Sequence, residues 1–331
     1  MIDKENYFKG FKPSFNQERY EELMKQTPTN FMTEYGNVNA DKHLVKSILG
    51  GCKLLSKEFD RNHIYYGGEG GGKSHTVFQH TYVWWWCLNE LGMINYDFSM
   101  DLIYGKVSDI MKSFDEYAEI PYMIFTLDES DELNRKNWNS PLVKQFLSKL
   151  RRERKNLRIV NMILPALEEM LPAIALSRTN WIVEINVKLD SKLNPIRGRY
   201  SLMNIPVGDE FFSPIRQDFI SKKEIKSYLN ARFYDKDKLF EKLPFKLLSF
   251  TGHTNSTFVF DKKEYKKWAI EVNKHNPEDD LSDLDKKRIQ QRDKLIVYLR
   301  KELGVKPGII SSVCNLSTTM IGDIVRKSTT N

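Results

Sequence analysis

The sequence predicts an α/β fold built on a mainly parallel β-sheet, followed by a small all-α domain near the C-terminus. Three observations support this prediction. Residues 62–91 have the pattern of a strand, a glycine-rich loop and a helix. An apolar run at Tyr122–Leu127 ends in two carboxylates, and residues 285–326 contain three stretches of helical spacing. A chain of 331 residues can bury a large core and is expected to contain more than one domain.

The glycine-rich loop matches the phosphate-binding pattern G-x-x-x-x-G-K-S. Glycines can adopt positive φ, which lets backbone N–H groups converge on an anion without side chains in the way. The start of the following helix adds partial positive charge. The residues expected to contact a nucleoside triphosphate are Gly67, Gly68, Glu69, Gly70, Gly71, Gly72, Lys73, Ser74 and His75.

The flanks of the loop fit this interpretation. Asn62–Tyr66 is typical of a short strand, and Ser74–Leu91 is typical of a buried helix. Strand, loop and helix are the context that a P-loop requires. We therefore expect ATP as ligand, with Lys73 on the β- and γ-phosphates and the Ser74 hydroxyl on Mg²⁺. The other interpretation is a flexible glycine turn that happens to precede Lys-Ser. It does not explain why a strand pattern precedes the turn and a buried helix pattern follows it.

The apolar run Tyr122–Leu127 predicts a strand that is buried on both faces. It delivers Asp128 and Glu129 about one βαβ repeat after the loop, which is the Walker B arrangement. Asp128 is expected to hold Mg²⁺, and Glu129 is expected to act as general base on the attacking water. The prediction places Lys73 and Asp128 at the tips of two neighbouring parallel strands. Asp131 and Glu132 are expected to be solvated or to contact a neighbouring subunit.

Arginines follow the carboxylate pair. Leu142–Arg158 predicts a helix whose end carries Arg151, Arg152 and Arg154. Cations suit a helix C-terminus, so a solvated face is one interpretation. The other is an arginine finger toward the nucleotide of an adjacent subunit, or a patch that contacts phosphates. Arg178, just before a predicted strand at Trp181–Val187, is either a sensor of the nucleotide state or an ordinary surface arginine.

Composition excludes several classes of protein. The three cysteines, Cys52, Cys87 and Cys314, have no zinc-type spacing. The first residues lack the pattern of a signal peptide, and no apolar run approaches the ~20 residues that span a bilayer. These features predict a cytoplasmic protein without membrane insertion. The net charge of +7 is weak support for a polyanionic partner.

The expected organisation has four parts. Residues 1–40 form an irregular N-terminal arm that wraps the core or a neighbouring subunit, and residues 41–212 form the P-loop core. Within that core we expect a helix broken at Gly50–Gly51, strands near 95–104 and 157–164, and a hairpin that turns at Gly198. Residues 213–280 form a mixed α/β extension, with a strand at Ser256–Phe260 and a linker at 276–280. Residues 281–331 form the C-terminal domain.

This last domain has the spacing of a helix-turn-helix. Asp285–Leu303 predicts a basic amphipathic helix, and two short helices follow at Lys306–Cys314 and Ser317–Arg326. Asn315 would take the αL position in the turn, and Ser317 would cap the second helix. Thr318, Thr319, Arg326 and Lys327 would face DNA. The alternative is a three-helix domain that docks a protein.

The order of P-loop, Walker B pair, arginine-rich helix and strand resembles the FtsK/HerA superfamily of P-loop ATPases, including those of mobile elements, viruses and conjugative systems. The resemblance covers roughly residues 40–205 and is specific only at Gly67–Ser74 and Asp128–Glu129. It implies a RecA-like core, a homohexameric ring and ATP-driven movement of DNA. The family has a polar sensor after the next strand, whereas this chain has Leu164–Pro165 there, with Asn161 as the nearest amide.

Three functional hypotheses follow. The first is an oligomeric ring ATPase that translocates, packages or transfers double-stranded DNA, with a protein partner in such a machine and, for a virus or mobile element, a place in the host cytoplasm. The second is an ATP-switched DNA-binding regulator or a replication or segregation factor. The third is a non-DNA ATPase that serves as an assembly factor.

Overall fold

The computed structural model describes residue 7 and residues 9–68, 70–128, 131–133, 137, 139–164, 179–189, 195–204, 248–255, 257–272, 283–314 and 317–328. The chain divides into two compact units, residues 1–273 and 274–331, which we describe separately. The linker expected at 276–280 lies outside the described residues.

The first unit is built on a seven-stranded sheet in the described part of the chain, with the order β4-β5-β6-β3-β7-β8-β9. Six strands run in the same direction and β8 alone runs against them. The prediction of an α/β fold with a mainly parallel sheet is therefore confirmed, and the arrangement is compatible with a RecA-like core. The strands are β3 (Arg61–Gly67), β4 (Ile103–Tyr104), β5 (Ile124–Leu127), β6 (Ile159–Leu164), β7 (Trp181–Leu189), β8 (Pro195–Asn204) and β9 (Leu248–His253).

Strand order corrects one expectation. The P-loop follows β3 and the carboxylate pair follows β5, but these strands are not neighbours because β6 lies between them. All six residues of β6 are buried, which suits a strand near the centre of the sheet. Chain order does not fix the order of strands in a parallel sheet, so the insertion could not be predicted from the local sequence.

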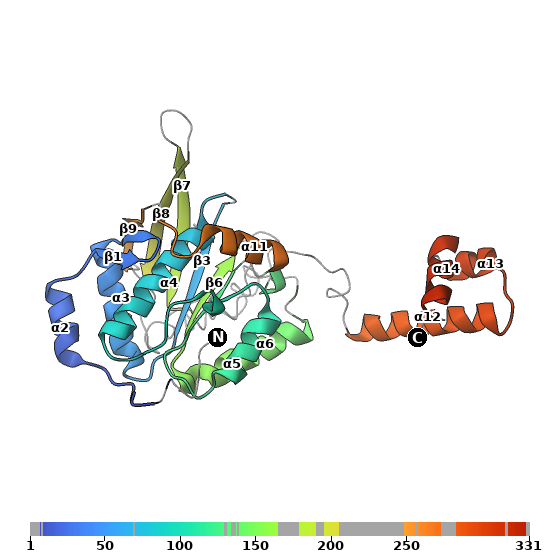
Figure 1. Cartoon of the computed structure of the whole chain (residues 1–331), viewed down its shortest axis with the longest axis horizontal. Helices are drawn as coiled ribbons and strands as arrows, with labels where there is room; N and C mark the ends of the chain where they lie inside the picture. Colours follow the sequence, from blue (N-terminus) through green and yellow to red (C-terminus); the bar gives the residue numbers. More distant parts are fainter. Residues whose placement is uncertain are drawn as a thin grey trace, which may run out of the picture. The chain divides into compact units, whose positions relative to one another are not determined.

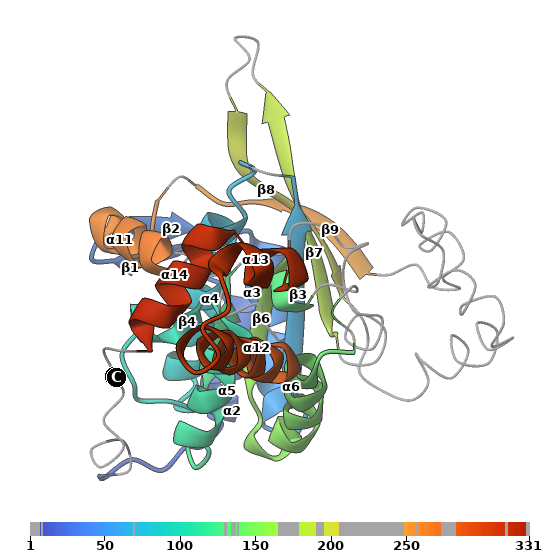
Figure 2. The same cartoon turned by 90° about the vertical axis from the view of Figure 1, so that its right-hand side faces the viewer.

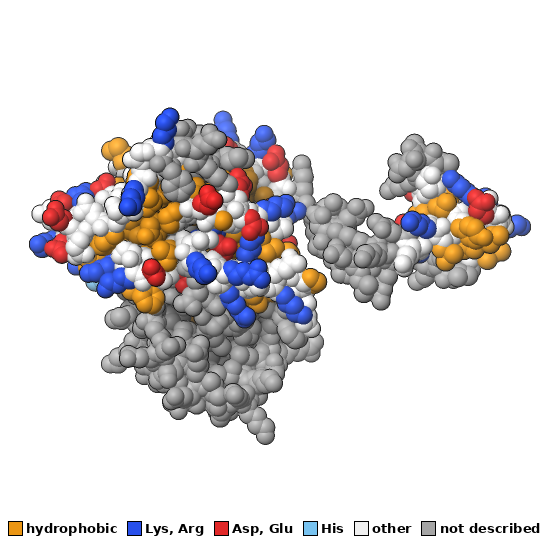
Figure 3. Space-filling view, turned by 90° about the horizontal axis from the view of Figure 1, so that it is seen from below, with side chains coloured by type: hydrophobic (Ala, Val, Ile, Leu, Met, Phe, Trp, Pro, Cys, Tyr) orange, Lys and Arg blue, Asp and Glu red, His pale blue; other side chains and the backbone are white. Residues whose placement is uncertain are grey.

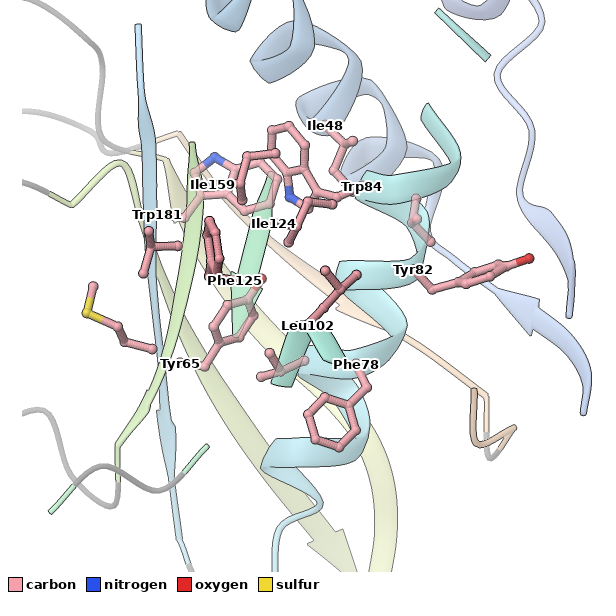
Figure 4. Packing of buried hydrophobic residues seen from close by; sticks show 14 of the residues in the cluster. Ile48, Tyr65, Phe78, Tyr82, Trp84, Leu102, Ile124, Phe125, Ile159 and Trp181 are labelled. Atoms are coloured by element: carbon pink, nitrogen blue, oxygen red, sulfur yellow. The ribbon is translucent and has the colours of Figure 1, made fainter. Parts of the chain in front are cut away.

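Helices cover the sheet as Figures 1 and 2 show. The described helices of this unit are α2 (Gln17–Lys25), α3 (Lys42–Leu55), α4 (Lys73–Glu90), α5 (Val107–Glu116), α6 (Pro141–Arg152) and α11 (Lys262–Val272). Helix α4 packs against β3, β5 and β6, while α5 packs against β4 and β5. Aromatic side chains including Trp84, Phe125 and Trp181 fill the layer between helix and sheet (Figure 4).

The expected break at Gly50–Gly51 is wrong, because α3 runs through both glycines. A Cβ at Gly51 would overlap the indole ring of Trp84 on α4. The glycine therefore permits close packing of two helices rather than ending one.

The N-terminal arm packs on the core, one of the two expected arrangements, but its described residues are not irregular. It contains α2 and a hairpin of β1 (Asn30–Thr33) and β2 (Gly36–Asn39), and it buries Leu23, Phe31 and Val38 in the core.

Four further boundaries differ from expectation. Residues 95–104 form only a 3₁₀ turn at Met100–Leu102 and the short β4. Helix α6 ends at Arg152, and a 3₁₀ turn at Glu153–Asn156 follows. Gly198 lies inside β8 and not in a turn, and residues 257–260 form no strand. At Gly198 φ is +82°, and a side chain there would overlap the carbonyl oxygen of Thr254, so close backbone approach explains this glycine.

The second unit contains three described helices, α12 (Asp283–Lys301), α13 (Pro307–Cys314) and α14 (Thr318–Lys327). Ile296, Ile310 and Ile321, one from each helix, form its small core. The predicted cap is present, since Ser317 Oγ accepts from the Met320 N–H at 3.2 Å. Asn315 and Leu316, expected in the turn, lie outside the described residues.

Candidate functional site: the loop after β3 and the carboxylate after β5

The glycine loop has the backbone geometry that the motif predicts. Gly72 caps α4 in the left-handed region, with φ +79° and ψ +32°, a conformation that only glycine adopts without strain. Gly67 has positive φ, and a side chain there would overlap the carbonyl oxygen of Ile185 on β7. Between them, the Gly71 N–H donates to the Gly68 carbonyl at 3.2 Å and closes a turn. The loop is thus folded tightly at the carboxyl end of β3.

The start of α4 is suited to an anion. The helix has 18 residues and its first turn carries no acidic side chain. No side-chain hydrogen bond caps it at Gly72 among the described residues. The first N–H groups of a helix lack intrahelical partners, and the helix dipole adds partial positive charge at this end. A phosphate group would satisfy both features.

Lys73 is the first residue of α4, and its ammonium lies against the loop. Its Nζ donates to the carbonyl oxygens of Gly67 at 3.0 Å and Gly68 at 3.4 Å. Although lysine side chains are rarely buried, this residue is 6% exposed. The contacts place a positive charge inside the loop, where the phosphates of a nucleotide would lie.

Ser74 and Asp128 meet directly, although their strands are separated by β6. Ser74 Oγ donates to Asp128 Oδ1 at 2.8 Å. Asp128 follows β5 and is 7% exposed, and its N–H donates to the Tyr104 carbonyl at 2.8 Å. The tips of β3 and β5 are therefore close enough for Ser74, in the helix after the glycine loop, to meet Asp128.

These two oxygen ligands fit a magnesium ion. Mg²⁺ prefers hard oxygen donors, and it usually takes one or two protein ligands together with water and substrate phosphates. Ser74 Oγ and Asp128 Oδ1 supply two such donors beside the loop. Within the residues that the structure describes, no group of three or more His, Cys, Asp or Glu side chains could hold a metal by itself.

Several predicted site residues cannot be placed. Glu69, the predicted base Glu129 and the predicted sensor Arg178 lie outside the described residues. His75 is described, and its ring stacks on Phe258 with centroids 5.5 Å apart.

The structure does not bring Arg151 and Arg152 to the loop. Both are exposed at the end of α6, just before β6 begins. The P-loop follows the last residue of β3, which is parallel to β6, so the length of a strand separates the two places. Seven residues in β3 correspond to roughly 20 Å. Arg151 and Arg152 therefore lie toward the ends of the strands opposite to the glycine loop, and the backbone of Arg154 follows them in the 3₁₀ turn.

Arg158, the last residue of the predicted basic helix, is buried. Its guanidinium pairs with Glu153 at 3.0 Å and donates to the carbonyls of Phe114 and Tyr117 at 2.9 and 3.1 Å. Burial lowers the pKa of this guanidinium to about 10, well above physiological pH. Arg158 therefore holds α5 to the strand β6 and is not part of a phosphate-binding face.

Asn161, the amide nearest to the sensor position, also faces inward. It lies in the middle of β6, where its Nδ2 donates to Thr81 at 2.9 Å and Thr126 at 3.3 Å. Its Oδ1 is 2.9 Å from Nδ1 of His63. Because a carbonyl oxygen only accepts, that ring nitrogen carries the proton. Burial lowers the pKa of His63 well below its ordinary value, so the imidazole is neutral. The network ties β3, β5 and β6 to α4 beneath the loop.

Near the carboxyl ends of the strands, the role of Tyr265 was not predicted and that of Glu132 was predicted wrongly. Tyr265 on α11 donates from its hydroxyl to Asp128 Oδ2 at 3.0 Å. No local signal pointed to it, because it lies 137 residues from its partner. Glu132, expected to be solvated or at a subunit contact, instead accepts from the Val107 N–H at 2.6 Å. It caps the first turn of α5, as acidic side chains do at helix N-termini.

Comparison with known proteins leaves the family open: no protein-family model matches the chain, and no curated protein matches it significantly. None of the described helices is both long and apolar enough to cross a membrane.

Proposed function

We propose that the first unit binds Mg²⁺–ATP and hydrolyses it to ADP and phosphate. One observation carries the proposal: Ser74 contacts Asp128 beside a glycine loop whose lysine is buried against it. Glycine backbone, ammonium, hydroxyl and carboxylate are the groups that bind a triphosphate and its metal. They come from the ends of two strands, and the serine and the aspartate are 54 positions apart in the sequence.

Each residue has a separate role in this proposal. The loop N–H groups and Lys73 bind the phosphates and neutralise their charge. Ser74 and Asp128 hold the ion, and bound Mg²⁺ supplies electrostatic stabilisation of charge on the phosphoryl oxygens. Glu129, the residue after Asp128, accepts a proton from the attacking water.

Replacing Glu129 with Gln tests the assignment of the base. We expect the variant to bind ATP with wild-type affinity and to lose turnover by about 10²- to 10⁴-fold, the range typical of general-base catalysis. Phosphate release in single-turnover experiments measures the loss, and a fluorescent ATP analogue measures binding. Glu119→Gln, on the turn after α5, serves as the matched control. Near-normal turnover in Glu129→Gln would show that another group is the base.

We further propose that this ATPase drives movement of double-stranded DNA as an oligomeric ring, with a hexamer as the expected state. The support is the motif order and a basic chain with a net charge of +7. Its exposed arginines Arg151 and Arg152 lie away from the loop of their own chain, where they are suited to reach a neighbour's nucleotide. On the face shown in Figure 3, however, basic side chains are interspersed with acidic ones.

The second unit supports a protein-docking alternative as well as DNA binding. Its exposed large apolar side chains are Leu295, Tyr298, Leu303, Ile309 and Met320, and Figure 3 shows apolar atoms gathered on one side of it. On α14, Arg326 pairs with Asp323 at 2.6 Å, so a carboxylate accompanies the cation there. Apolar surface of this kind is more typical of a protein contact than of a DNA-reading face.

A truncation after residue 280 separates these alternatives. If the chain is a DNA motor, the full chain should hydrolyse ATP several-fold faster when long duplex of any sequence is added. If the second unit supplies the DNA contact, truncation should have a specific effect. The truncated chain should keep basal ATPase activity but lose most of its duplex affinity, measured by fluorescence anisotropy at several salt concentrations. Unchanged duplex affinity after truncation would assign the DNA contact to the first unit. A preferred DNA site with slow hydrolysis would favour the regulator, and absence of salt-sensitive affinity would favour the assembly factor.

A further inference from the structure

The described residues that follow β9 form a strap along the end of the sheet where the glycine loop lies; we use this name for residues 254–255 and 257–272. β9 runs parallel to β3 and β5, so it ends at the edge where the P-loop lies. The start of the strap is held by side-chain amides. Gln79 on α4 donates to the Asn255 carbonyl at 3.0 Å, and Asn255 Oδ1 accepts from the Asn39 N–H at 3.2 Å.

From there the strap runs across the ends of the strands, from β9 toward β4. Phe258 stacks on His75, next to the P-loop serine, and Phe260 packs against Phe78 and Phe98. The last residue of α11, Val272, lies so close to Gly105 after β4 that a side chain at Gly105 would overlap it. The strap therefore starts at β9, one edge strand, and ends over β4, the other edge strand.

Tyr265 lies on the strap, directly over the tip of β5. Its ring is held by Phe78, Phe258 and Trp268, with centroid distances of 5.3, 5.1 and 5.7 Å. Its hydroxyl donates to Asp128 Oδ2 at 3.0 Å, while Ser74 donates to Oδ1 at 2.8 Å. The two carboxylate oxygens of Asp128 therefore have different partners: Oδ1 accepts from Ser74 beside the glycine loop, and Oδ2 accepts from Tyr265 on the strap.

We propose that Tyr265 is a positioning residue that orients Asp128 toward the magnesium ion. The inference rests on the proposed nucleotide site. With Oδ2 held by the tyrosine, the carboxylate cannot rotate freely, and Oδ1 stays directed at Ser74, the second expected metal ligand. Hydrogen bonds that orient a metal ligand in this way typically contribute 10- to 100-fold to metal affinity. The strap thereby becomes part of the metal site without touching the ion.

Tyr265→Phe tests this role because it removes the hydroxyl and keeps the ring. The measurement is direct binding of a fluorescent, non-hydrolysable ATP analogue to the full chain during a Mg²⁺ titration. We expect the Mg²⁺ concentration at half-saturation to rise about 10-fold. Nucleotide affinity in EDTA and the thermal midpoint should stay at wild-type values. At saturating Mg²⁺, kcat should return to within about twofold of wild type, which separates a metal effect from a general loss of structure.

Two controls make the test specific. Tyr298→Phe, at an exposed tyrosine of α12, should leave the Mg²⁺ titration unchanged. Phe260→Leu, on the strap but without a contact to Asp128 among the described interactions, should lower the thermal midpoint without shifting Mg²⁺ half-saturation. Adding Tyr265→Phe to Asp128→Asn should produce no further shift, since the acceptor is already changed.

The outcomes separate this inference from the proposed function. If Tyr265→Phe has the wild-type Mg²⁺ dependence, or shifts it equally in the Asp128→Asn background, the positioning role is overturned while the ATPase stands. If the wild-type chain itself shows no Mg²⁺-dependent nucleotide binding, the proposed function fails first.

Discussion

Lys73→Ala is expected to weaken nucleotide binding strongly while leaving the fold intact. The ammonium contacts only loop carbonyls within the described interactions, so its removal costs the fold little. It removes the charge expected on the phosphates, and charge-assisted hydrogen bonds of this kind contribute about 3 kcal/mol. That loss corresponds to roughly a 100-fold rise in Kd for ATP, measured by fluorescence titration or calorimetry.

The matched control is Lys112→Ala. Lys112 is 79% exposed and pairs with Asp109 on the surface of α5, far along the chain from the loop. Exposed pairs of this kind contribute about 1 kcal/mol at most, so both binding and thermal midpoint should stay near wild type. Tight ATP binding by folded Lys73→Ala protein would mean that the loop does not hold the triphosphate.

Asp128→Asn is expected to lower the rate of catalysis strongly. The substitution preserves shape but removes the negative charge that attracts the metal, and an amide binds Mg²⁺ less well than a carboxylate. We expect kcat to fall on the order of 10²- to 10³-fold at fixed Mg²⁺, the loss that follows removal of a group stabilising transition-state charge. Phosphate release over a range of Mg²⁺ concentrations provides the measurement.

Binding without metal supplies the internal check on Asp128→Asn. In EDTA the variant should bind ATP at least as well as wild type, because a carboxylate next to phosphates is repulsive in the absence of a cation. Asp109→Asn, at an exposed aspartate, is the surface control. An unchanged Mg²⁺ dependence in Asp128→Asn would remove Asp128 from the metal site.

The parts of the site that could be predicted are those encoded locally. Gly67 to Ser74 specify one loop within eight residues, and the strand before Asp128 is identified by its apolar side chains alone. The structure gives both elements the expected geometry and brings Ser74 to Asp128. Local sequence was also sufficient for α4, α5 and the cap of α14, since each depends on neighbours within a few residues.

What could not be predicted depends on distant partners. The insertion of β6 between β3 and β5 is a property of the sheet, not of any one strand. A Gly-Gly pair such as Gly50–Gly51 is typical of a helix break. The reason for Gly51 inside a helix is its close packing against the indole of Trp84 on another helix. The strap carries aromatic residues at helical spacing, but nothing in α11 indicates that Tyr265 meets Asp128. Arg158 resembles its exposed neighbours in sequence and differs from them only in burial.

The strap also has a consequence for the order in which the site is completed during translation. Tyr265 leaves the ribosome 137 residues after Asp128, and Asn255 follows Asn39 by 216 residues. At ~5–20 residues per second, the aspartate waits roughly 7 to 27 seconds for its tyrosine. Asp128 therefore acquires its hydrogen bond to Tyr265 only after the chain has been synthesised as far as the strap.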